Sequence, residues 1–124
     1  MRFFSPVMIT KPLFVRETHD RFGQTLKQGD KVIAQLIAAN HDPARFKNAT
    51  DLLADRRPNA HIGFGFGPHV CLRIHLARLE VQIALERLFQ RFPNLERCPI
   101  DALPLYGQRV GFRGMKHLKV KLRP

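Results

Sequence analysis

The pattern of hydrophobic and polar positions predicts one long helix between residues 72 and 92. Apolar side chains recur there at steps of three and four residues, which is the spacing of one helix face. Two neighbouring rows carry the pattern: Leu72, Leu76, Leu79 and Ile83, and beside them Ala77, Val81, Ala84 and Leu88. Phe92-Pro93 ends the helix, because proline lacks a backbone N–H. The polar stripe is narrow, so the helix is expected to contact neighbours on most sides.

Residues 1–60 show shorter apolar runs, which predict extended segments rather than helices. The segments are 3–9, 13–16 and 32–38, with turn residues at Pro12, Gly23 and 28–30. An Asp42-Pro43 turn follows, and then an irregular charged connection over 44–58. The first half of the chain therefore predicts a small mixed sheet.

The chain after the predicted helix returns to short strands. Turn residues stand at Pro104 and Gly107, and Leu118, Val120 and Leu122 alternate with basic residues. The whole pattern predicts an α+β fold in which short strands follow the long helix.

A glycine-rich loop and a cysteine stand directly before the predicted helix. Gly63, Gly65 and Gly67 alternate with bulky residues, so the backbone can turn tightly where a flat ligand comes close. Cys71 lies at the expected helix start, where unpaired N–H groups and the helix dipole stabilise a thiolate. Cys71 is therefore a candidate metal ligand or nucleophile.

Three other interpretations of this loop are weaker. A zinc site could be formed by His61, His69, Cys71 and His75, but their spacing matches no common zinc module. A dinucleotide site lacks the last glycine step and the acidic residue downstream. A catalytic cysteine lacks an evident base.

Composition narrows the class of protein. The 124 residues suit one domain, and two cysteines are no disulfide framework, so we expect a reducing, cytoplasmic location and an inert Cys98. Residues 1–6 offer neither a signal peptide nor a membrane span, which predicts a soluble protein without a membrane partner. The net charge of +11, from 21 basic and 10 acidic residues, favours an anionic partner without identifying it.

The loop and the predicted helix together contain a spaced set of residues: Phe64, Gly65, Gly67, His69, Cys71, Leu76, Ala77, Arg78 and Glu80. This set resembles the haem-binding signature of the bacterial cytochrome P450 monooxygenases. Arg73 departs from the family, which usually has glycine there, close to the porphyrin. The resemblance implies that Cys71 binds the iron of haem b as a thiolate, and that Phe64, Gly65 and His69 contact the cofactor.

Arginines earlier in the chain extend the resemblance. Arg16 resembles the family's arginine that pairs with a haem propionate, for which a guanidinium fork is well suited. Arg2 and Arg56 match the two arginines of the family's buried Glu-Arg-Arg network, whose glutamate would lie before Met1. Without that glutamate, we expect Arg56 to pair with Asp51 or Asp55 or to stay in water.

The resemblance covers nearly the whole chain but only the C-terminal third of the family's domain. It implies a single region, 1–124. The region comprises a sheet and irregular meander over 1–60, the haem-ligand loop over 61–71, a helix over 72–92, and closing strands over 93–124 that resemble the family's closing β-hairpin. A separate N-terminal P450 chain is a candidate partner that would supply the remainder.

The family's role is haem-thiolate monooxygenation of a small hydrophobic substrate, using O2 and electrons from a redox partner. The resemblance implies an acidic partner of ferredoxin or flavodoxin type, and no nucleic acid. We expect the chain alone to be inactive, because the elements that bind substrate and deliver protons are missing. The alternative is a non-catalytic basic remnant or binding module for nucleic acid or protein, the product of a truncated gene.

Overall fold

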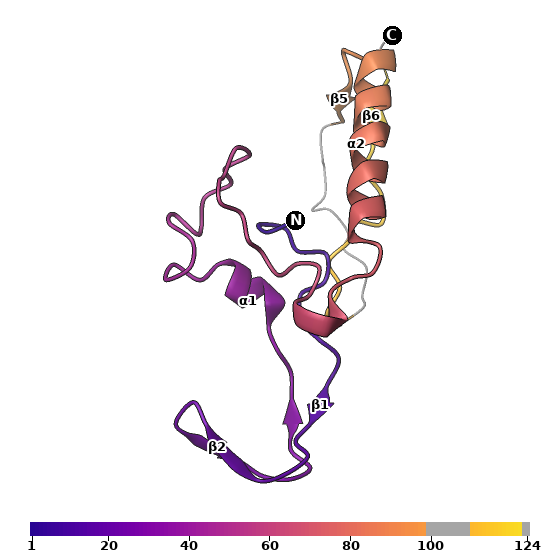
Figure 1. The fold of residues 1–124 in the computed structure, drawn as a ribbon. Helices are drawn as coiled ribbons and strands as arrows, with labels where there is room; N and C mark the ends of the chain where they lie inside the picture. Colours follow the sequence, from indigo (N-terminus) through magenta and orange to yellow (C-terminus); the bar gives the residue numbers. More distant parts are fainter. Residues whose placement is uncertain (99–109, 123–124) are drawn as a thin grey trace. The chain divides into compact units, whose positions relative to one another are not determined.

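The computed structural model of the protein describes residues 1–98 and 110–122 (Figure 1). The chain divides into two compact units. Unit 1 comprises Met1–Gly63 and Val110–Phe112, and unit 2 comprises Phe64–Arg109 and Arg113–Pro124. The predicted turns at Pro104 and Gly107 lie outside the described residues.

Unit 1 contains two short antiparallel strand pairs. Strand β1 (Leu13–Phe14) pairs with β4 (Lys31–Val32), and β2 (His19–Arg21) pairs with β3 (Gln24–Leu26). The two pairs are nested in sequence, so residues 13–32 form one two-stranded ribbon (Figure 1). Gly23 and Gly29 have φ angles of 73° and 89°, which confirms the turns predicted there.

Two predicted extended segments of unit 1 differ in the structure. Segment 3–9 forms no strand and contributes only isolated bridges at Val7 and Ile9. The prediction of an extended segment up to residue 38 is wrong, because helix α1 runs over Leu36–Asn40. The run Leu-Ile-Ala-Ala is apolar at every position, so periodicity cannot distinguish strand from helix, and leucine and alanine have high helix propensity.

The interior of unit 1 is largely polar. Asn40 and Ser5 are fully buried, and the Asn40 amide donates to Ser5 Oγ at 2.8 Å. Asn40 Oδ1 accepts the N–H of Ile62 at 2.9 Å, which fastens the segment before the glycine loop to α1. The buried apolar residues among those described are Val15, Phe46 and Ala49. Hydrogen bonds therefore position the chain here more than a large apolar core does.

Arg2 and Arg56 are held by backbone carbonyl groups. Arg2, only 4% exposed, donates to the carbonyls of Asn40 at 2.7 Å, Ala49 at 2.8 Å and Asp51 at 3.1 Å. Burial, and the positive charge of Arg56, lower the pKa of Arg2.

The Arg56 guanidinium donates hydrogen bonds to the backbone carbonyls of Lys47 at 2.6 Å and Asn48 at 2.8 Å. It also donates a longer one, of 3.5 Å, to the backbone carbonyl of Asp51. Its Nε is buried without a hydrogen-bond partner among the described residues. The predicted pairing with a carboxylate of Asp51 or Asp55 is therefore replaced by carbonyl contacts. The irregular connection over 44–58 folds back so that three of its own backbone carbonyls accept hydrogen bonds from the Arg56 guanidinium.

Unit 2 is built on helix α2 (Ile74–Arg91), which lies within the predicted range of 72–92. No residue of α2 is buried, and Leu76, Leu79 and Leu88 are 46%, 53% and 37% exposed. The described part of the chain thus does not supply the neighbours that the apolar pattern predicts.

Strand β5 (Glu96–Arg97) pairs antiparallel with β6 (Val120–Lys121). No described helix is long and apolar enough to cross a membrane.

Candidate functional site

The loop that precedes α2 is closed by its own backbone. The N–H of Cys71 donates to the carbonyl of Phe64 at 2.8 Å, and a single 3-10 turn, η1 (Gly67–His69), lies between them. Gly65 has a φ of 82°, and a Cβ there would lie 3.2 Å from the His69 carbonyl oxygen. Glycine is therefore favoured at position 65, by the positive φ and by the closeness of the His69 carbonyl. The loop thus holds Cys71 at a defined place relative to Phe64.

Cys71 lies slightly before the helix rather than in its first turn. Arg73 is the N-cap of α2, and a turn joins the two residues, with the N–H of Ile74 donating to the Cys71 carbonyl at 3.2 Å. The side chain of Cys71 is exposed, and both cysteines of the chain are free thiols. The result is an accessible sulfur on a backbone that hydrogen bonds hold on both sides.

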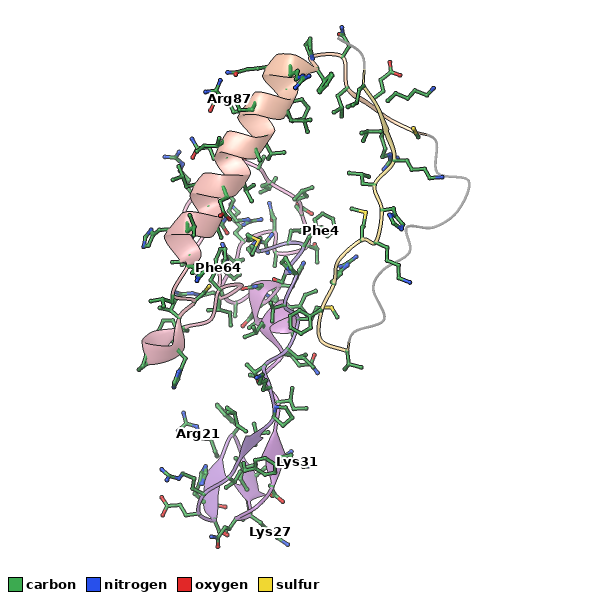
Figure 2. All side chains as sticks on the ribbon, turned by 90° about the vertical axis from the view of Figure 1, so that its right-hand side faces the viewer. Phe4, Arg21, Lys27, Lys31, Phe64 and Arg87 are labelled. Carbon is green, nitrogen blue, oxygen red and sulfur yellow. The ribbon has the colours of Figure 1, made fainter. Side chains whose placement is uncertain are left out.

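Phe64 connects this loop to α2. Its ring is half-buried, and the guanidinium carbon of Arg78 lies 5.7 Å from the ring centroid. This distance fits a cation–π contact. Figure 2 shows Phe64 beside the first turns of α2. Sequence reasoning recognised Arg78 only as a signature position, whereas the structure gives it a physical role in fastening the loop.

The predicted site residues fall in both units. Phe64, Gly65, His69 and Cys71 share the loop of unit 2, where His69 is exposed at the end of η1. Arg16 is exposed in unit 1, between β1 and β2, and is not part of this loop.

The described histidines near the loop do not form a metal cluster with its cysteine. His61 accepts a hydrogen bond from the Gly63 N–H at 3.1 Å, a local contact in the approach to the loop. No group of three potential metal ligands among His, Cys, Asp and Glu gathers within 1–98 and 110–122.

Arg73 occupies ordinary backbone conformation. Its φ and ψ are −100° and 22°, which any residue can adopt, and its side chain is exposed. The chain therefore needs no glycine at this position for its own backbone.

The geometry suits a single thiolate ligand. An accessible sulfur on a backbone held by hydrogen bonds can bind one coordination position of an iron cofactor. Gly65, which has no side chain, lets the loop backbone pass close to the His69 carbonyl. The residues present thus fit a haem iron held from one side by Cys71.

Comparison with known proteins gives a consistent result. The family model described as Cytochrome P450 matches residues 1–108. The polyketide biosynthesis cytochrome P450 PksS of Bacillus subtilis (strain 168) is 38% identical over 98% of this chain and 30% of its own length. The biotin biosynthesis cytochrome P450 of the same organism is 41% identical over 97% of this chain and 30% of its own length.

Solved structures agree with this result. P450BioI, in complex with an acyl carrier protein ligated to hexadec-9Z-enoic acid, has a TM-score of 0.89 at 40% identity and covers 98% of this chain. The structure of PksS has a TM-score of 0.89 at 36% identity over 99% of this chain. The chain spans about 30% of the length of these curated relatives. It belongs to the cytochrome P450 family and has the fold of the corresponding part of that domain.

Proposed function

We propose that this chain is the haem-thiolate part of a P450 monooxygenase, with Cys71 as the axial ligand of haem b. The supporting observation is the exposed thiol of Cys71 on a loop closed by the Cys71–Phe64 backbone bond. A thiolate-bound haem supplies the cleavage of dioxygen that monooxygenation requires.

The other loop residues would position the ligand. Phe64, whose ring lies against Arg78 of α2, would hold the loop to the helix and so fix the position of Cys71. Gly65 would let the loop close without a clash at the His69 carbonyl. We assign the exposed Arg16 and His69 to the haem propionates, because a guanidinium and an imidazole can both donate hydrogen bonds to a carboxylate.

A complete site needs residues beyond those in this chain. The relatives are about three times longer, and α2 has no buried residue. We therefore propose that a complementary P450 segment covers α2 and provides the substrate side of the haem. An acidic redox protein of ferredoxin or flavodoxin type fits the net charge of +11. The reaction would be oxygenation of a small hydrophobic substrate in the cytoplasm, where both thiols stay reduced.

The names of the relatives do not select a substrate. PksS and the biotin biosynthesis enzyme act in different pathways by their names, yet both match this chain at similar identity. The alternative of a basic nucleic-acid or protein binder gains no support from these relatives, which are all P450s.

The decisive experiment is spectroscopy of the full chain with added haemin. After reduction under carbon monoxide, we expect the red-shifted Soret band of thiolate ligation, and Cys71→Ala should abolish it. Cys98→Ala is the matched control, because it removes the only other thiol and should leave the band intact. Persistence of the band in Cys71→Ala, or its loss in Cys98→Ala alone, would contradict the assignment.

A further inference from the structure

The turn at the end of the unit 1 ribbon has a phenylalanine where a small polar residue is usual. Arg21 pairs with Gln24, so the loop consists of Phe22 and Gly23 alone. Their φ angles are 54° and 73°, as in a type I′ turn, which prefers asparagine, aspartate or glycine at its first position. For a bulky side chain this conformation is an outlier. The requirements of the turn therefore do not explain Phe22.

Packing within the protein does not explain Phe22 either. Its side chain is 91% exposed, and the guanidinium carbon of Arg21 lies 5.1 Å from the ring centroid. Backbone strain reduces the stability of the folded chain, and the ring gains nothing from folding because it stays in water. A contact outside the protein that removes the ring from water would supply that gain and offset the strain.

Basic and apolar side chains continue along the same ribbon. Phe14 is 61% exposed with Lys31 Nζ 5.9 Å from its ring centroid, and Leu13 beside it is also 61% exposed. Residues 13–32 contain four Lys or Arg and three Asp or Glu, a net charge of +1. Figure 2 shows Arg21, Lys27 and Lys31 along this ribbon.

Two of the three acidic side chains in the ribbon take part in its turns. Asp20 accepts a hydrogen bond from the Thr25 hydroxyl at 2.6 Å, and Asp30 accepts one from the Lys27 N–H at 2.8 Å. These two carboxylates stabilise the ribbon locally. Arg21 lies over the Phe22 ring and Lys31 over the Phe14 ring, so positive charge flanks both exposed rings.

We propose that the ribbon of residues 13–32 is a peripheral anchor for an anionic lipid bilayer, with Phe22 inserted at the membrane interface. Arg21 and Lys31 can place their aliphatic stems along the apolar region while their charged ends meet lipid phosphates. Phe22, Phe14 and Leu13 would gain from leaving water, because their side chains are apolar. Such contact needs no membrane-crossing helix, and it changes the sequence-based expectation of no membrane partner.

Insertion of the turn can be measured directly, because the chain has no tryptophan. Phe22→Trp places a single reporter at the tip, to be mixed with vesicles of equal parts phosphatidylcholine and phosphatidylglycerol. We expect a blue-shifted emission and quenching by lipids with brominated acyl chains. Val110→Trp is the control, because Val110 lies in the same unit and is 89% exposed. Its emission should stay unchanged even where the net charge of +11 draws the whole chain to the vesicle.

A second variant separates binding from folding. Phe22→Asn removes the ring and suits the type I′ turn, so the ribbon should persist while vesicle partitioning falls about tenfold. Val110→Asn should partition like the wild type. The proposal is overturned if Phe22→Asn partitions like the wild type or if the reporter at position 22 stays water-exposed on the vesicles. It is also overturned if oligo-dT, and not the vesicles, shifts that reporter, because the ribbon would then bind single-stranded nucleic acid.

Discussion

The interior of unit 1 and the helix of unit 2 differ in which side chains they bury. In unit 1, Asn40 and Ser5 are fully buried and hydrogen-bonded to each other. In unit 2, α2 has two apolar rows yet no buried residue, and Leu79 remains 53% exposed. The side chains of Asn40 and Ser5 find their hydrogen-bond partners within the described part of unit 1, whereas the apolar surface of α2 is suited to packing that the described residues do not provide. The local spacing of apolar residues therefore determines that a helix forms, but it does not determine which residues pack against that helix.

The largest expected effect tests the polar centre of unit 1. Asn40→Ala would remove the acceptor for the Ile62 N–H and the donor to Ser5, so the free energy of unfolding should fall by about 2–4 kcal/mol. Urea denaturation followed by circular dichroism measures this change. Asn59→Ala is the control, because Asn59 is an exposed asparagine of the same unit, and it should change stability by less than about 0.5 kcal/mol. Equal effects of the two substitutions would show that the Asn40 network does not hold unit 1 together.

An intermediate effect on the free energy of unfolding is expected at Gly111, which lies against the side chain of Ile9. A Cβ at Gly111 would lie 2.7 Å from Ile9 Cγ1, and the φ of Gly111 is 84°, so Gly111→Ala should cost about 1–3 kcal/mol. Gly114→Ala is the matched control, since a Cβ there meets nothing within 4 Å. The same denaturation experiment compares the two. A neutral Gly111→Ala would mean that residues 110–112 do not pack on Ile9 in solution.

The smallest expected effect concerns the exposed helix. Leu79→Ala should change the free energy of unfolding by less than about 0.5 kcal/mol, because the leucine is half exposed and alanine is the better helix former. A fully buried leucine would cost about 2–5 kcal/mol instead. Denaturation at two protein concentrations checks the value. A loss above about 2 kcal/mol would show that α2 is covered in solution, and dependence on concentration would identify a second copy as the cover.

Sequence reasoning was most successful where the relevant interactions are local. The three- and four-residue spacing after Cys71 predicted a helix, and α2 lies over Ile74–Arg91. Glycines predicted turns at positions 23 and 29, where φ is positive. The prediction of an extended segment over 32–38 failed at α1, because the run Leu-Ile-Ala-Ala at 36–39 is apolar at every position and has no periodicity that separates helix from strand.

Contacts between distant residues could not be predicted in the same way. The bond from Ile62 to Asn40 joins residues 22 apart, and Arg2 reaches Asn40 across 38 positions. No spacing rule marks such pairs. The carbonyl contacts of Arg56 were missed for a related reason: backbone groups are present at every residue, so composition does not show which of them converge.

The sequence by itself determined the family signature, the ligand candidate Cys71 and the long helix, because each depends on residue identity at short, fixed spacings. Only the tertiary structure decided that Phe64 stacks with Arg78 and that Asn40 centres a buried polar network. It also decided that Phe22 occupies an exposed, left-handed turn position. These features depend on which surfaces meet and which remain in water, and that depends on the free energy of the whole folded chain rather than on any single segment.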